Sequence, residues 1–217
     1  MEIKLRPFSV STGRMLLLEE ILRTGDLASA TAELAAGFRA RFGLPPLYEL
    51  GLVVPDAERA AGDLEAQGVR RFLILAGRPV LWRDRGEDGS PQGKMGLAFH
   101  QGVELELLEP MQGSDFYNQS IDPEGRPVVH HLGFLVDDVD QWAGKLTTAG
   151  FPVWVRGRLR LGPLRCEFAY MDTVADAGLI VEFIDWRLFG RAFSPPAGVL
   201  GGLAQLIKWS GRRSLSV

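Results

Sequence analysis

The chain has 217 residues, 46% hydrophobic and 24% charged, with a formal net charge of −3. This composition is that of a globular protein with an ordinary core, and the small net charge favours neither nucleic acid nor an anionic membrane as a partner. The apolar runs are shorter than the roughly 20 residues of a membrane span, no signal peptide is evident, and a single cysteine excludes an intrachain disulfide. We therefore expect a cytoplasmic protein.

The first 46 residues are predicted to form a small helical extension. Residues 14–22 and 27–41 have helical periodicity, and the second helix has Thr24 or Asp26 near its start and Gly43 at its end. A stiff Leu-Pro-Pro connector follows. We expect this extension to pack on the main domain or to cover a dimer interface.

An internal repeat begins after the connector. Residues 49–69, ELGLVVPDAERAAGDLEAQGV, align without a gap with residues 131–151, HLGFLVDDVDQWAGKLTTAGF, and eight of these 21 positions are identical. Each copy reads as an apolar strand, an aspartate suited to cap a helix (Asp56 or Asp138), an amphipathic helix, and a glycine that ends the helix. So much identity in an ungapped window indicates a duplicated module.

Strands follow the helix in each copy. After the first helix we predict strands at 71–75, 79–83, 95–100 and 103–109, of which only three need belong to the module. After the second helix we predict strands at 153–161, 165–171 and 179–184. Each copy closes on a strand with one carboxylate inside an apolar run, so each reads as βαβββ. The predicted modules are residues 47–112 and 128–188.

Side chains alternate between the two faces of a strand, so the apolar residues of the first and last strands would pack on the helices. The opposite faces then bring four residues together, namely Glu49, Glu106, His131 and Glu182. The adjacent His130 has the opposite alternation and would point elsewhere on a regular strand. Because inward carboxylates are costly unless paired or coordinated, three of them near one imidazole favour a divalent cation such as Co, Ni, Mn, Zn, Mg or Fe.

With these residues, positions 47–186 resemble the vicinal oxygen chelate superfamily of glyoxalases, bleomycin-resistance proteins and dioxygenases. The stretch VELELLEPMQGSDF followed by VVHHLGFLVDD is most similar to methylmalonyl-CoA epimerases, and the Glu/His/Glu set is equally similar to that of glyoxalase I. The resemblance implies an α+β fold in which two βαβββ modules pair into a cup-shaped mixed β-sheet barrel. It also implies a homodimer and metal ligation by Glu49, Glu106, His131 and Glu182. The first of these positions is usually histidine or glutamine in the family.

The activity that the resemblance implies is that of a metal-dependent epimerase, isomerase or lyase. It would act through a metal-stabilised enolate on a small oxygenated carbonyl substrate or thioester. Three ionised carboxylates and a neutral imidazole around a divalent ion leave a net charge of −1. One glutamate is therefore protonated or serves as the base, and we assign the base to Glu182 or Glu49.

Two other activities stay open at this point. One is a non-catalytic binding protein of the bleomycin-resistance type, which needs no metal. The aromatic Trp82 and Trp154 support this alternative, because such proteins hold a hydrophobic or aromatic ligand. An Fe(II) oxygenase is disfavoured, because only His131 occupies a ligand position. Simpler interpretations of two residues of the cluster also remain. Glu106 would then be a solvated residue on an exposed strand, and Glu49 would not bind a metal.

The strand at 153–161 alternates so that Trp154, Arg156 and Arg158 share one face. These residues are candidates for binding a substrate carboxylate or phosphate, although a solvated outer strand is the simpler interpretation. Residues 189–217 are predicted to be a C-terminal appendage, in which 199–209 could form a short amphipathic helix with a basic end. Such a helix would lie on a membrane surface or, more simply, pack on the protein's own body or on a second subunit.

Overall fold

The computed structural model describes residues 15–23, 25–194 and 215–216. The first module consists of β1 (Glu49–Val53), α4 (Ala57–Ala66), β2 (Leu73–Gly77), β5 (Gly93–His100) and β6 (Val103–Leu108). The second consists of β7 (Val128–Leu135), α5 (Val139–Thr148), β8 (Val153–Leu161), β9 (Leu164–Met171) and β10 (Ile180–Leu188), with a short α6 (Val174–Ala177) before its last strand. The predicted α+β fold of two βαβββ modules is confirmed.

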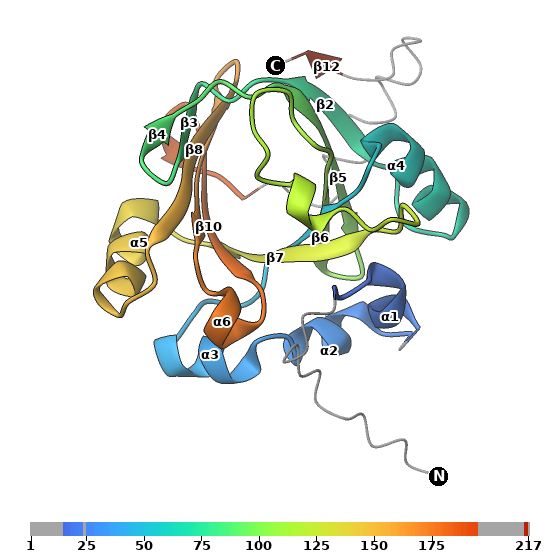
Figure 1. Ribbon diagram of the computed structural model, residues 1–217, viewed down its shortest axis with the longest axis horizontal. Helices are drawn as coiled ribbons and strands as arrows, with labels where there is room; N and C mark the ends of the chain where they lie inside the picture. The colour runs from blue at the N-terminus through green and yellow to red at the C-terminus, as the bar shows by residue number, and fades with distance from the viewer. Residues whose placement is uncertain (1–14, 24, 195–214, 217) are drawn as a thin grey trace.

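The two modules form one curled mixed sheet (Figure 1). In each module the first and last strands pair in parallel, β1 with β6 and β7 with β10. An antiparallel pairing between β1 and β7 joins the modules. The strands run in the order β2-β5-β6-β1-β7-β10-β9-β8, and β12 (Leu215–Ser216) extends the β2 edge. The first and last strands of both modules therefore lie side by side at the centre of the sheet.

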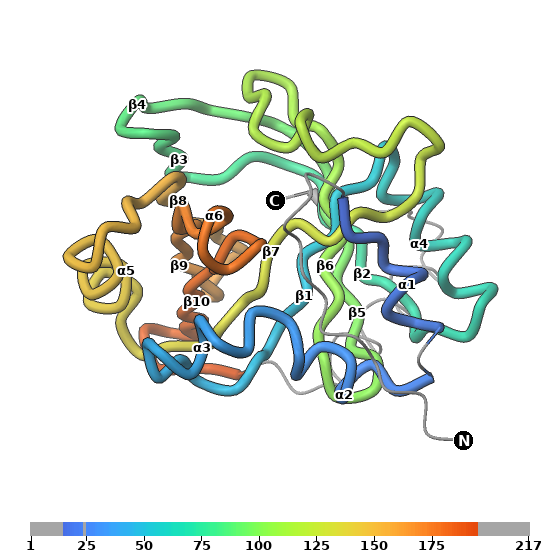
Figure 2. Tube along the Cα trace, turned by 60° about the horizontal axis from the view of Figure 1, so that its bottom comes forward, coloured from blue at the N-terminus to red at the C-terminus, as the bar shows by residue number. Residues whose placement is uncertain are grey.

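One strand of the first copy lies outside its own module. β3 (Leu81–Asp84) pairs with β8 of the second module and continues into β4 (Glu87–Asp88), as Figure 2 shows. The buried Trp82 on β3 packs edge-on against Phe116 and Phe168. The expectation that only three of the four strands belong to the first module is thus met, because the apolar Trp82 side chain is buried against the other module.

Three short helices precede the sheet and lie beneath it in Figure 1: α1 (Leu18–Leu22), α2 (Leu27–Ala32) and α3 (Ala36–Phe42). Asp26 caps α2 by accepting a hydrogen bond from the Ser29 amide. The prediction of one helix over 27–41 is wrong. Ala35 has a left-handed backbone (φ 51°), and the Arg39 side chain donates to carbonyl oxygens at the end of α2.

The sheet has an apolar layer on each face. On the outer face, β-strand residues such as Leu50 and Leu132 pack with α4, α5 and the N-terminal helices, including Ile21 and Phe38. On the inner face lies a second buried cluster rich in aromatic side chains: Trp82, Phe116, Tyr117, Phe168, Tyr170 and Trp186. The N-terminal helices therefore share the outer core of the sheet.

Among the described residues, no helix is long and apolar enough to cross a membrane. The amphipathic helix predicted at 199–209 lies outside the described residues.

Candidate metal centre

Four side chains meet on the inner face, one from each central strand: Glu49 on β1, Glu106 on β6, His131 on β7 and Glu182 on β10. All four are buried, and one ligand atom from each lies within 4.8 Å of the others. His131 Nε2 is the centre, 2.9 Å from a Glu182 oxygen, 3.3 Å from Glu49 and 3.4 Å from Glu106. The predicted set is thus brought together by the structure.

Two glycines at equivalent positions of the repeat make room for this cluster. Gly51 pairs with Glu106 on one side and with His131 on the other, and Gly133 pairs with Glu49 and Glu182 in the same way. A Cβ at Gly51 would lie 1.8 Å from His131 Cε1, and one at Gly133 would lie 2.8 Å from Glu49 Cβ. Each module therefore has a glycine where a side chain would collide with a residue of the cluster from the other module.

Burial and mutual repulsion favour the protonated carboxyl groups. Burial and the charge of Glu182 raise the pKa of Glu49 to about 7, and burial and the charge of Glu49 raise that of Glu106 to about 7. Burial raises the pKa of Glu182 as well. For His131, burial acts to lower the pKa, but Glu182 and hydrogen bonds to the carboxylates outweigh it and raise the pKa well above its ordinary value. Without a cation, side chains of this cluster therefore remain partly protonated near neutral pH.

The donor set fits a divalent cation. Glu106 Oε2 and Glu182 Oε2 are buried, and within the part of the chain that the structure describes their one neighbouring donor is His131 Nε2, at 3.4 and 2.9 Å. A single N–H group cannot satisfy the oxygens of three carboxylates at once. Buried carboxylate oxygens that are only partly satisfied are costly unless a further positive charge compensates them. Three carboxylates and one imidazole suit a hard or borderline metal ion, and Cys166 is not part of the cluster.

His130 lies closer to the centre than a regular strand allows. The β1–β7 register shifts at a β-bulge, with Gly51 opposite His131 and Leu52 opposite Val129. The bulge leaves His130 as the extra residue. Its Nδ1 lies 3.1 Å from His131 Nδ1, and its ring packs on Phe116 and Tyr117.

Because burial and His131 lower the pKa of His130, its ring is neutral and can accept a hydrogen from His131 Nδ1. That hydrogen bond would leave His131 Nε2 directed at the carboxylates. The expectation that His130 points away from the site is corrected by the bulge.

Glu104, on β6, is a further buried carboxyl group next to the cluster. It pairs with Glu49 in the β1–β6 register and accepts a hydrogen bond of 2.7 Å from the Tyr48 hydroxyl. Burial and the charge of Glu49 raise its pKa well above the ordinary value. Glu104 therefore contributes a fourth carboxyl group behind Glu49.

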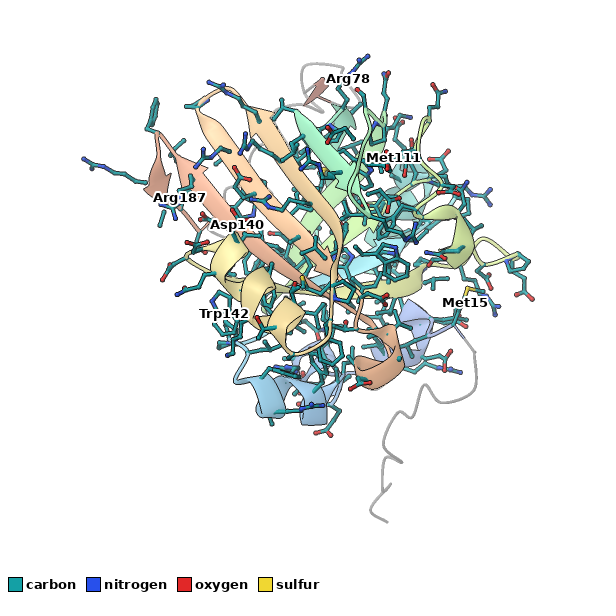
Figure 3. All side chains as sticks on the ribbon, turned by 60° about the vertical axis from the view of Figure 1, so that its left-hand side comes forward. Met15, Arg78, Met111, Asp140, Trp142 and Arg187 are labelled. Carbon is teal, nitrogen blue, oxygen red and sulfur yellow. The ribbon has the colours of Figure 1, made fainter. Side chains whose placement is uncertain are left out.

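A cavity of about 70 Å³ opens from this cluster, with Glu49, Glu106 and Glu182 in its lining. The rest of the lining is mostly apolar and aromatic, including Trp82, Tyr117, Phe168, Tyr170 and Trp186. Arg78 and Met111, at the upper end of the molecule in Figure 3, also line it, and Arg78 is exposed. The shape and lining suit a small molecule with an apolar part and a polar group at the carboxylate end.

The predicted substrate-binding residues do not share a face. A second bulge, at Trp154 between Val153 and Val155, turns the Trp154 ring inward against Phe116. Arg156 points outward, with Nε 2.9 Å from Asp140, which Figure 3 labels on α5.

Arg156 Nη2 and Arg158 Nε also lie 2.7 and 2.5 Å from the carboxylate of Glu167. The interpretation of Arg156 and Arg158 as an anion clamp is therefore wrong. They belong to an ion-pair network on the outer side of the sheet, and neither lines the cavity.

A family model described as the glyoxalase/bleomycin resistance protein/dioxygenase superfamily matches residues 50–170. A comparison with curated proteins found no significant match.

Among solved structures, a methylmalonyl-CoA epimerase variant of Streptomyces coelicolor in complex with 2-nitronate-propionyl-CoA is 18% identical. It covers 65% of this chain and 96% of its own, with a TM-score of 0.42. The Mycobacterium tuberculosis methylmalonyl-CoA epimerase is 14% identical, covers 64% of this chain and 85% of its own, and has a TM-score of 0.39. A hypothetical protein of Bacillus halodurans is 14% identical, with coverages of 64% and 91% and a TM-score of 0.37. Since these scores are low, the family assignment rests on the sequence match.

Proposed function

Since the chain belongs to the glyoxalase/bleomycin resistance protein/dioxygenase superfamily, we propose that it is a metal-dependent epimerase, isomerase or lyase. Its substrate would be a small oxygenated carbonyl compound or thioester. The observation that carries the proposal is the buried Glu49, Glu106, His131 and Glu182 cluster, in which three carboxylates share the single donor atom His131 Nε2. A divalent ion held there supplies a Lewis acid that polarises a substrate carbonyl and eases removal of the neighbouring proton.

The chain's own residues would move that proton. The three carboxylates carry one more negative charge than a divalent ion neutralises, and the imidazole is neutral. One carboxylate is therefore available as a base. Glu49 and Glu182 are our candidates. Both line the cavity where the substrate would lie, as Glu106 also does, and Glu49 stands at the position where the family usually has histidine or glutamine. The base removes the proton next to the carbonyl and returns it to the other face or to the adjacent carbon. The aromatic lining would keep water from the charged intermediate.

A second candidate function is supported by that same lining. The cavity is bordered by five aromatic side chains, Trp82, Tyr117, Phe168, Tyr170 and Trp186. A protein that binds a hydrophobic molecule without transforming it would use such a surface. The buried carboxylates favour the enzyme, because a purely sequestering cavity gains nothing from bearing their desolvation cost.

The first test is metal binding by the full chain. Metal-free protein would be titrated with Co²⁺ and the bound ion counted by elemental analysis, alongside His131→Ala and, as a control, the exposed Glu87→Gln. We expect about one ion per chain in the wild type and in the control, and a loss of at least about 100-fold in affinity in His131→Ala. Absence of binding in the wild type would refute the proposed function.

The second test follows the proton. Co²⁺-loaded protein would be incubated in D₂O with a panel of 2-hydroxy acids, 2-oxo acids and 2-methyl-branched thioesters, and deuterium incorporation followed by NMR. We expect exchange next to the carbonyl of at least one compound, lost in Glu49→Gln or in Glu182→Gln. Retention of full exchange in both variants would show that neither glutamate is the base. Binding of panel compounds without any exchange would favour the sequestering function.

A further inference from the structure

Two tyrosines flank the carboxylate cluster, and neither was singled out from the sequence. Tyr117 lies in the connection between the modules, just before the short 3₁₀ turn η1 (Asn118–Ser120), and Tyr170 lies on β9. Both are almost completely buried, and both line the cavity with Glu106 and Glu182. Their hydroxyl oxygens are 3.2 Å apart. The structure thus places a paired phenol in the wall of the cavity.

The pair has one hydrogen more than it uses. Two hydroxyl groups carry two hydrogens, and a hydrogen bond between them consumes only one. Among the residues that the structure describes, neither hydroxyl has another acceptor within hydrogen-bond distance. A buried donor without an acceptor is unfavourable unless a ligand or water satisfies it. The second hydrogen is therefore available to a molecule in the cavity.

Aromatic contacts hold the pair in place. The Tyr170 ring stacks on Phe116 with centroids 5.4 Å apart and lies 4.9 Å from the ring of His131. The Tyr117 ring packs edge-on against Phe116 at 5.3 Å and against His130 at 5.3 Å. The pair is thus fixed beside the imidazole at the centre of the cluster, and it needs little reorganisation to donate.

We propose that the Tyr117–Tyr170 hydroxyl pair donates a hydrogen bond to an oxygen of the substrate beside the carboxylate cluster. The proposal rests on the proposed function and deepens it by selecting substrates. The bound molecule would have two neighbouring oxygens, one directed to the cluster and one to the phenols. An oxygen that gains negative charge when the neighbouring proton is removed would strengthen this bond, since the two hydroxyl groups are buried and the donor is already oriented.

Oxalate, a small anion with vicinal oxygens, is a suitable probe. Its binding to the Co²⁺-loaded full chain would be measured from the visible spectrum of the ion, for the wild type, Tyr117→Phe, Tyr170→Phe and the double variant. The affinity for Co²⁺ itself and the melting temperature would be measured on the same samples. Tyr48→Phe is the matched control, because it removes the same atom from a tyrosine whose hydroxyl is bonded to Glu104 and which does not line the cavity.

We expect at least one single variant to weaken oxalate binding by about 10-fold or more, as loss of a hydrogen bond to an anion does. The double variant should lose little more oxalate affinity than the single variant that binds oxalate more weakly. One hydroxyl donates to the ligand and the other only holds it in place, so their contributions are not additive. The affinity for Co²⁺ should change by no more than about 2-fold.

Unchanged oxalate affinity in all three variants, or an equal loss in Tyr48→Phe, would overturn the proposal while leaving the metal site intact. Failure of the wild type to bind Co²⁺ would instead overturn the proposed function and this inference with it.

Discussion

Replacing Gly51 with alanine should remove His131 from the centre of the cluster. The new Cβ would lie 1.8 Å from His131 Cε1, whereas ordinary contact begins at 3.4 Å, so the imidazole must move by about 1.6 Å. His131 is completely buried and packs against Tyr170, so the ring has no space to yield without a wider rearrangement. Overpacking of this kind costs about 1 to 3 kcal/mol of stability.

A displacement of 1.6 Å also decides metal binding, because ligand distances tolerate only about 0.2 Å. We therefore expect Gly51→Ala to lose at least about 100-fold in Co²⁺ affinity, measured by titration of metal-free protein. Gly133→Ala should have a smaller effect, since its Cβ would lie 2.8 Å from Glu49 Cβ, which is about 0.6 Å short of the 3.4 Å of ordinary contact, against about 1.6 Å at Gly51. Gly62→Ala on α4 is the control: nothing lies within 4 Å, and helix propensity predicts a gain of about 1 kcal/mol. Wild-type Co²⁺ affinity in a folded Gly51→Ala variant would refute the account of the glycine pair.

Three further predictions concern the pH dependence of stability, the support of His131 by His130, and the outer ion pairs of Glu167. Because the folded-state pKa values of Glu49 and Glu106 are raised to about 7 from 4.5, the folded metal-free protein retains protons that the unfolded chain loses, and its melting temperature should fall as pH rises from about 4.5 to about 7. The lowered pKa of His130 has the opposite effect, because it raises the melting temperature as pH rises toward 6.5. His130→Leu removes this contribution, so a melting temperature that stays constant or rises from pH 4.5 to 7 in this variant would contradict the raised pKa values of the two glutamates. His130→Leu should also weaken Co²⁺ binding by about 10- to 100-fold through loss of its contact with His131, and equal affinity would show that His131 needs no such support. Glu167→Gln should destabilise the protein by about 3 kcal/mol in denaturant titrations without changing Co²⁺ affinity, and a change in metal binding would place the outer ion pairs in the site.

The repeat was sufficient to predict the modules and the convergence of the four polar residues. Equivalent positions in two copies must occupy equivalent strands. Parallel pairing of the first and last strands brings Glu49 and Glu106 to one face two residues apart in register, and His131 and Glu182 in the same way. The sequence could not predict the bulges at His130 and Trp154. A bulge depends on the register with a partner strand, and each one turns a side chain that strict alternation assigns to the other face.

Two other features also depended on tertiary contacts. The inward direction of Tyr170 is consistent with its alternation with Phe168 on β9, but Tyr117 lies in an irregular connection without periodicity. The transfer of β3 to the second module depends on Trp82 finding Phe116 and Phe168, and no pattern within residues 79–83 specifies a partner strand.

The transfer of β3 also bears on whether the two halves could exist apart. If the chain were cut in the connection between β6 and β7, the first fragment would still carry β3, so β8 would lose its neighbour and expose an unpaired edge. The central β1–β7 edges would be opened as well. Although the duplicated sequence suggests two equal units, we expect neither half to fold on its own, because each would expose unpaired strand edges. Expressed as separate chains, the halves should be recovered only as a complementing pair.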